Sequence, residues 1–285
     1  MDATQEDWEQ ELKDISEIID RVAAFEGKAA GNAQNLFTVL ENLAKAGEKL
    51  DKAYNYAERL FDEDQTNTTH QAMSAKAYSA YASCGSKTAF VDPEIIAIPE
   101  NVLETFYKEV PGLELYRKQI AEIRRMKEHC LSSEMEKLLA MTAEMSQTPA
   151  DTFSILNNAD LVFPEIKDEN GESVRITHGR YGQFLQSSDR RVRKEAFEKL
   201  SQTYKQFLNT SASLYSGNIK QQVFHAKARK YVSSLECAVD ANHVSSSVYH
   251  NLIDKVNKNL DKMHHSVSLR KKCLNLDEMH MYDIY

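Results

Sequence analysis

The chain has 285 residues, enough for one large hydrophobic core or two medium ones, and this length favours about two domains. It carries 35 Lys and Arg against 43 Asp and Glu, which gives a formal charge of -8 and a pI of about 5.7. Such an excess of negative charge disfavours binding to nucleic-acid phosphates and anionic lipid, and no apolar run reaches the roughly 20 residues that span a bilayer. We therefore expect neither nucleic acid nor a membrane as a partner.

The first residues and the cysteines indicate the compartment. Residues 1–7 are acidic, whereas a secretion signal begins with basic residues. No Cys-x-x-Cys pair of the kind that binds zinc or performs dithiol redox chemistry is present. The four widely separated cysteines are Cys84, Cys130, Cys237 and Cys273. We interpret the protein as cytoplasmic, with reduced thiols.

Helical periodicity dominates the first part of the chain. Apolar residues that recur every three or four positions predict three helices, over residues 8–25, 36–61 and about 69–83. Pro93 and Pro99 suit the first turns of helices. A further helix is expected from about Glu100 to Val110. The pattern therefore predicts a multi-helix lobe in this part of the chain.

Residues 113–160 predict three more helices. The first carries apolar side chains from Leu113 to Leu131. Ser133, with Glu136 three positions later, forms a capping-box pattern that predicts the start of the second. Thr148-Pro149 predicts the start of the third, because proline is favoured in a first helical turn.

One β-hairpin is predicted in this otherwise helical chain. Residues 161–166 and 173–177 are prone to form strands, and Asn170-Gly171 between them supplies the left-handed turn that a hairpin needs. Pro164 cannot donate a hydrogen bond to a neighbouring strand, so its strand is expected at a sheet edge. A two-stranded hairpin is only marginally stable alone, and flanking helices should therefore pack against it.

The last hundred residues again predict helices. After a short helix at 181–185, Ser188-Asp189 is expected to cap a long helix whose apolar stripe ends near Val223. Another long helix is predicted over 248–267. The basic run 190–194 is interpreted as intrahelical ion pairs on a solvated face. The apolar residues from Leu274 onwards are expected to be exposed.

Several segments carry a family resemblance when they are taken together and in order. They are 90–95, 129–132 with 136–140, 153–160, the hairpin 163–177, 188–197, 228–231, 269–274 and Tyr282-Asp283. These segments resemble landmarks of oligoendopeptidase F and its relatives among the thimet-oligopeptidase-like zinc metallopeptidases. The resemblance covers essentially the whole chain.

The resemblance implies a bilobed, mostly helical enzyme with a long internal channel, in which a zinc-bound water hydrolyses short peptides. In that family His-Glu-x-x-His on one helix and a Glu on a later helix hold the metal, since two His four residues apart share a helix face. None of the nine histidines here is followed by Glu with a second His four residues on. The chain therefore resembles the amino-terminal part of such an enzyme, ending before the zinc helix.

On this resemblance we expect a mainly α fold with one small β-hairpin, an incomplete form of the bilobed peptidase fold. The segments are an amino-terminal helical lobe, an oligopeptidase F-type domain with the hairpin, and the start of the catalytic domain, at 1–112, 113–186 and 187–285. The chain would form channel wall and scaffold. The expected partners are oligopeptide substrates and the missing carboxyl-terminal catalytic half. Zinc belongs to the full-length family enzyme, and none is expected on this chain.

No catalytic or metal-binding residue is expected on this chain. His178, Arg180 and Tyr181, directly after the hairpin, are candidates for contact with substrate in the channel, and structural packing is the alternative. His264 and His265 would point about 100° apart on a helix, so both cannot readily bind one ion. The competing function is a non-enzymatic helical scaffold or binding module.

Overall fold

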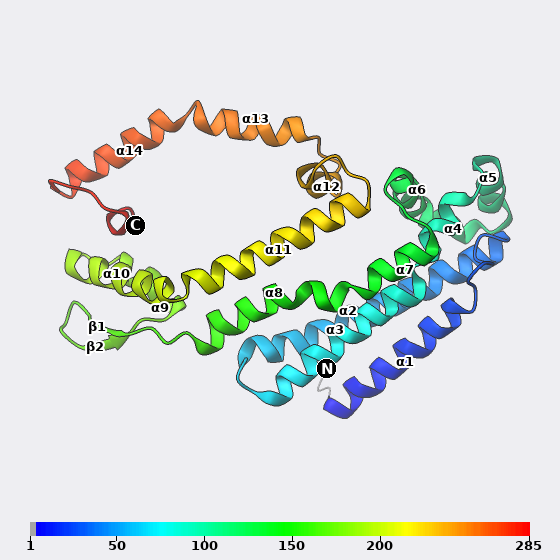
Figure 1. Cartoon of the computed structure of the whole chain (residues 1–285), viewed down its shortest axis with the longest axis horizontal. Coiled ribbons are helices and arrows are strands. Elements are labelled where there is room, and N and C mark those ends of the chain that lie inside the picture. Colours follow the sequence, from blue (N-terminus) through cyan, green and yellow to red (C-terminus); the bar gives the residue numbers. More distant parts are fainter. Residues whose placement is uncertain (1–3) are drawn as a thin grey trace. The chain divides into compact units, whose positions relative to one another are not determined.

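The structure, a computed structural model, describes residues 4–285 as helices and one small hairpin (Figure 1). It has two compact units: the described residues up to Thr152 with Phe224–Tyr231, and Phe153–Val223 with Val232–Tyr285. The predicted fold class, mainly α with one small hairpin, is confirmed. The division into three segments at residues 112 and 186 stays a prediction.

Three long helices form the first part of unit 1, and each packs against the other two. They are α1 (Gln5–Ala23), α2 (Ala33–Glu63) and α3 (Thr68–Thr88). Thr4 begins α1 with a capping box to Asp7, which satisfies backbone N–H groups that a helix start leaves open. The buried Trp8 ring donates its N–H to the carbonyl of Ala53 on α2 at 2.8 Å, so the largest side chain of this core leaves no polar atom unpaired.

A second core in unit 1 joins shorter helices to the loop between α1 and α2. These helices are α4 (Val91–Ala97), α5 (Glu100–Glu109), η1 (Pro111–Tyr116), α6 (Arg117–Arg125) and η2 (Met126–Glu128). The Glu94 carboxylate accepts hydrogen bonds from the backbone N–H groups of Gly27, Ala29 and Ala30 at 2.6 to 3.3 Å. One side chain of α4 thereby fixes the α1–α2 loop.

Helices α7 (Ser133–Met141) and α8 (Ala143–Ile155) correct two predicted helix starts. The capping box at Ser133 is wrong: Ser132 occupies the cap, and Glu136 instead accepts from the N–H of Leu131. The start at Thr148 is also wrong, because Pro149 lies inside α8. The break between the helices falls at Thr142, where the side-chain hydroxyl donates to the carbonyl of Leu139.

A partly buried ion pair fixes Phe224–Tyr231, the segment that rejoins unit 1. The Arg229 guanidinium donates to both carboxylate oxygens of Glu136, at 2.9 and 2.8 Å. The His129 ring stacks on Tyr231 with 3.7 Å between centroids, which agrees with a packing role for His129. Burial, with the nearby Glu136 carboxylate, raises the pKa of the Cys130 thiol to about 11, so this thiol is protonated and unreactive at neutral pH.

In unit 2 the hairpin packs against a helix, as the sequence predicted. Strands β1 (Glu165–Lys167) and β2 (Ser173–Arg175) are antiparallel, and α9 (His178–Leu185) and α10 (Arg190–Gln206) follow. The core between them holds Phe163, Ile166, Ile176, Phe184, Val192 and Ala196. Asp189 caps α10 by accepting from the N–H of Arg191, so that predicted cap is confirmed.

The remaining helices of unit 2 correct two predicted long helices. They are α11 (Leu208–Ala228), whose last turns belong to unit 1, α12 (Ser234–Asp240), α13 (Ser246–Asn257), α14 (Leu260–Cys273) and η4 (Met281–Asp283). One predicted helix breaks at Phe207 and the other at Lys258-Asn259. The apolar periodicity runs across both breaks, and neither carries Gly or Pro, so the pattern gave no sign of them.

Asp283, fully buried near the end of the chain, docks η4 on the start of α10. Arg190 donates to its carboxylate from Nε and Nη2, and Arg193 donates from Nη2 at 2.8 Å. Burial alone would raise the pKa of Asp283, but the hydrogen bonds from both arginines outweigh it and hold the pKa well below its ordinary value of 3.8. The intrahelical pairing predicted for 190–194 is therefore wrong for Arg190 and Arg193. The exposure predicted for the apolar residues of the tail is wrong for Tyr282, which is buried.

Gly171→Val tests the hairpin turn. Gly171 has φ +86°, and a Cβ added there would touch nothing within 4 Å, so the cost of a side chain is purely conformational. We expect Gly171→Val to lower the free energy of unfolding by about 1 kcal/mol or more, because a β-branched residue resists the left-handed region. Gly171→Asn, which tolerates that region, is the control and should cost less. Equal midpoints of urea unfolding for the two variants would contradict the assignment of a left-handed turn at Gly171.

Asp283→Asn tests the docking of η4. The variant removes the charge that two arginines share, and we expect it to lower the free energy of unfolding by about 2 kcal/mol. The loss is no larger because water screens the interaction of Asp283 with the half-exposed Arg190. The folded-state pKa is depressed, so the difference from the parent chain should be complete above about pH 4 and should shrink as the pH falls further. Glu278→Gln, which removes an exposed charge five residues earlier, is the control. A pH-independent difference would contradict this account.

Candidate functional site

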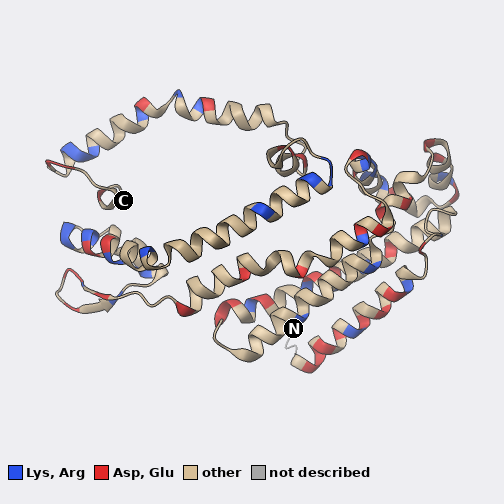
Figure 2. Ribbon diagram, in the orientation of Figure 1, with Lys and Arg blue, Asp and Glu red and all other residues tan. Residues whose placement is uncertain are grey.

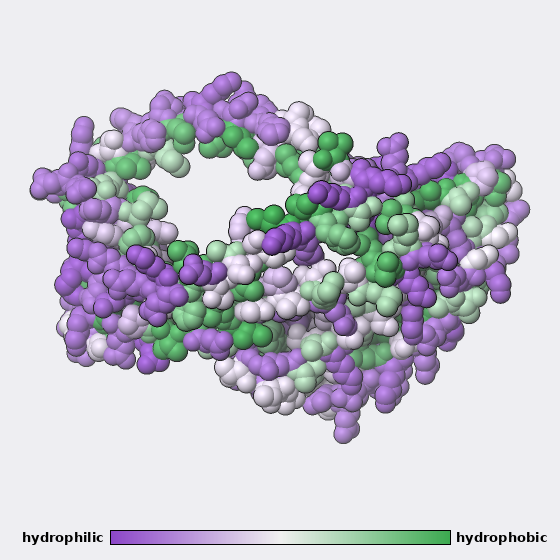
Figure 3. Space-filling model, viewed as in Figure 1, coloured by the Kyte–Doolittle hydropathy of each residue, from purple (hydrophilic) through white to green (hydrophobic). Residues whose placement is uncertain are grey.

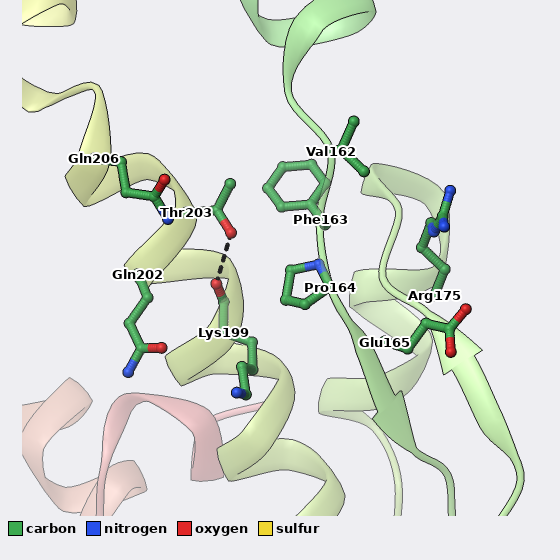
Figure 4. Close-up of a pocket in the computed structure, with 9 residues that line it drawn as sticks. All are labelled: Val162, Phe163, Pro164, Glu165, Arg175, Lys199, Gln202, Thr203 and Gln206. Carbon is green, nitrogen blue, oxygen red and sulfur yellow. Dashed lines mark hydrogen bonds between the residues drawn. The ribbon is translucent and has the colours of Figure 1, made fainter.

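A pocket of about 380 Å³ lies between the hairpin and α10 within unit 2 (Figure 4). On one side are the residues that lead into β1, with Arg175 of β2 beside them, and on the other is the second half of α10. The pocket is lined by Val162, Phe163, Pro164, Glu165, Arg175, Lys199, Gln202, Thr203 and Gln206. We call it the hairpin groove.

The register of the hairpin sets which backbone groups of β1 face away from β2. Pro164 accepts from the N–H of Ile176, and Asp168 donates to the carbonyl of Glu172, so these residues point towards β2. The direction of the backbone groups alternates along a strand of an antiparallel pair, so the backbone N–H and carbonyl groups of Glu165 and Lys167 point away from β2. The carbonyl of Lys167 accepts from Arg191, whereas Glu165 lines the groove. The groove therefore borders an outer strand edge.

The opposite wall is one face of α10. Lys199, Gln202, Thr203 and Gln206 have the spacing i, i+3, i+4, i+7, which aligns side chains along a helix. Thr203 is buried, and its hydroxyl donates to the carbonyl of Lys199 (Figure 4). Gln202 and Gln206 are exposed, so their amides can donate to and accept from a bound molecule. Lys199 adds a positive charge that forms no ion pair within the part of the chain that the structure describes.

An aromatic cluster supports the base of the groove. The Phe163 ring lies 5.1 Å from the His178 ring, edge to face, and 5.7 Å from the ring of Tyr204. Tyr204 donates its hydroxyl proton to Oδ1 of Asn157 at 2.6 Å. Asn157 lies in the π-helical turn η3 (Leu156–Asp160) that leads to the hairpin. The rings of His178 and Tyr204 therefore hold Phe163, a groove residue, between them, and Asn157 holds Tyr204.

The three residues predicted from the sequence occupy different surroundings. His178 contacts Phe163 and approaches the carbonyl of Asn157 at 3.3 Å, so it lies next to the groove. Tyr181 packs against the unit 2 core, where burial raises its pKa. Arg180 has an exposed side chain, and its N–H donates to the Thr177 hydroxyl. None of the three lines the groove, and their contact with substrate stays a prediction.

The α10 wall was not predicted from the sequence. The apolar stripe predicted the helix, and only its basic run 190–194 was interpreted as a solvated face. The signal was the polar run of Lys199, Gln202, Thr203 and Gln206 along one side of a helix next to the hairpin. That signal becomes specific only when the hairpin is known to pack on α10.

The described residues contain no group of three or more His, Cys, Asp or Glu side chains that could hold a metal ion. His243 and His250, which could share a helix face on spacing alone, do not: His243 lies in a turn with φ +54° and His250 lies in α13. His264 and His265 are exposed on α14. No helix over residues 4–285 is both long and apolar enough to cross a bilayer.

Comparison with known proteins gives two family matches. The family described as "Oligopeptidase F" matches residues 94–163. The family described as "Peptidase family M3" matches residues 183–285. The second match includes α10, the helix that forms one wall of the hairpin groove.

The relatives are about twice as long as this chain. Oligopeptidase PepF of Bacillus subtilis (strain 168) is 40% identical over 282 residues, an alignment that covers 99% of this chain and 42% of PepF. Group B oligopeptidase PepB of Streptococcus agalactiae is 38% identical, over 99% of this chain and 47% of PepB. The crystal structure of oligoendopeptidase-F from Enterococcus faecium matches with a TM-score of 0.94 and 38% identity, over 98% of this chain and 54% of that one.

We expect the purified 285-residue chain to take up no stoichiometric zinc and to cleave no peptide. Zinc catalysis needs three protein ligands and an open position for water, and the His-Glu-x-x-His pattern is absent. Without a metal the pKa of water stays far above neutrality, which leaves almost no hydroxide at neutral pH. Equilibrium dialysis followed by a quenched-fluorescence peptide assay measures both, with B. subtilis PepF as the control. Metal uptake with chelator-sensitive cleavage would overturn this expectation.

Proposed function

Since this chain belongs to the oligoendopeptidase F family of M3 peptidases, we propose that it forms the peptide-binding wall and scaffold of a zinc-dependent endopeptidase that hydrolyses short peptides. The zinc site and the catalytic residues would belong to a catalytic part outside these 285 residues. The chain spans 42% of PepF and 47% of PepB, which supports this division of roles. We propose a cytoplasmic location for this enzyme.

The hairpin groove is the observation that carries the proposal. Its outer strand edge presents the backbone of Glu165, and an extended peptide can add to such an edge as a further strand. This mode reads the peptide main chain, so it suits an enzyme that accepts many sequences. A pocket of about 380 Å³ has room for a few residues of a short peptide.

Side chains on the two walls complement a peptide. Gln202 and Gln206 can each donate to a peptide carbonyl and accept from a peptide N–H. Lys199 can meet a carboxylate of the peptide, and Phe163 offers an apolar surface. Ser173 donates to the Glu165 carboxylate at 2.7 Å, which holds that side chain at the rim. The groove has the means to bind a peptide and, by itself, no group that would cleave it.

The test is a titration of the isotope-labelled chain with an unmodified nonapeptide, followed by NMR. We expect saturable shifts of the backbone amides in 162–165 and 199–206. The double variant Gln202→Ala/Gln206→Ala should weaken binding at least fivefold, because it removes both amides that face the peptide.

The matched control is Gln183→Ala/Gln186→Ala. These exposed glutamines line a different hollow, of about 470 Å³, elsewhere in unit 2. We expect that variant to bind the peptide like the parent chain. Equal loss of binding in both variants, or shifts confined to other regions, would contradict the groove as the peptide site.

A further inference from the structure

Helix α13 carries an apolar stripe that its own unit leaves uncovered. Val248, Tyr249, Leu252, Ile253 and Val256 are between 42% and 62% exposed, although their spacing places them on one side of the helix. Figure 3 shows green side chains along one side of the α13–α14 segment and purple ones along the other. Contiguous apolar faces of this kind mark interaction surfaces.

The neighbouring elements show why the stripe stays open. Within the described chain α13 packs against α12, a helix of seven residues that is too short to cover it. Helix α14 carries further exposed apolar side chains, Met263 and Leu269. Both helices lie inside the region that aligns with PepF over 99% of this chain. The relatives therefore contain this segment and also more than half of a chain that has no counterpart here.

The polar residues around the stripe carry a net positive charge. Residues 246–273 contain six Lys and Arg and two Asp, although the chain as a whole has a formal charge of -8. Figure 2 shows the basic residues in the last turn of α14, which are Arg270, Lys271 and Lys272. A surface that fits this one is apolar at its centre and acidic at its edge.

We propose that the apolar stripe of α13 is the docking surface for the catalytic part of an oligoendopeptidase F chain, the part that carries the zinc-binding motif. This inference rests on the proposed function and names the surface through which the two parts meet. The catalytic part would cover Leu252 and Ile253 with apolar side chains and meet the basic rim with Asp and Glu. Docking covers the stripe of α13 and joins the peptide-binding wall to the part that carries the metal site.

The experiment compares the 285-residue chain with a chimera in which it replaces the matching 42% of B. subtilis PepF. Hydrogen exchange of the α13 amides is measured in both proteins. We expect exchange at 248–256 to be at least tenfold slower in the chimera, since docking covers the stripe. The substitutions Leu252→Asp and Ile253→Asp together should abolish that protection and lower the melting temperature of the chimera.

The matched control is His250→Asp with Asn251→Asp, which adds the same two charges on the other side of α13. We expect this control to keep the protection, and both double variants to leave the melting temperature of the isolated chain unchanged, since all four side chains are exposed. Equal exchange of α13 in both proteins, or two parts of the chimera that unfold independently, would overturn the proposal. Dimerisation of the isolated chain would also overturn the proposal if Leu252→Asp with Ile253→Asp abolished it, because a second copy of the chain would then cover the stripe. Protection of α13 without peptidase activity would uphold the docking surface and count against the proposed function.

Discussion

The buried carboxylate of Asp283 is the constraint on which unit 2 depends. A charge removed from water is costly unless it is paired, and Arg190, Arg193 and the backbone N–H of His280 all donate to it. Both arginines lie in the first turn of α10, about ninety residues earlier in the chain. Asp283 therefore closes a loop that contains α11 to α14, much of which is exposed. Without this closure the part of the loop after Tyr231, which contains α12 to α14, would have only its short local contacts to hold it, and its conformational entropy would favour opening.

Helix α10 contacts several other parts of unit 2, and each of its sides has different partners. Its first turn binds Asp283 and, through Arg191, the carbonyls of Lys167 and Asp168 in the hairpin. Its apolar side, with Val192 and Ala196, packs under the hairpin. Its polar side forms one wall of the hairpin groove. The hairpin could not be stable alone, and the groove exists only because this helix both supports the strands and faces their edge.

The sequence predicted what depends on local patterns. Helix α2, the cap at Asp189 and the turn at Gly171 follow from periodicity, from one short polar side chain and from a glycine with positive φ. What it missed depends on partners far away in the chain. Glu136 has the spacing of a capping residue but pairs with Arg229, and Arg193 sits in a basic run but is buried against Asp283. The sequence neighbours of a charged residue do not determine whether its side chain is solvated or buried. The polar wall of the groove was not predicted for a related reason, because its residues face a pocket only once the hairpin packs on α10.

A wall without catalytic groups can still contribute to catalysis by a peptidase. Interactions with parts of a substrate far from the scissile bond can position that bond, and their binding energy is useful when it is realised in the transition state. A groove that holds the peptide main chain at a strand edge would restrict the peptide to an extended form before it meets the metal. That restriction acts only if the wall and the metal are rigidly joined. The proposed role of the groove in catalysis therefore depends physically on the docking surface: the hairpin groove can orient a peptide towards zinc only when a surface such as the α13 stripe holds the catalytic part in place.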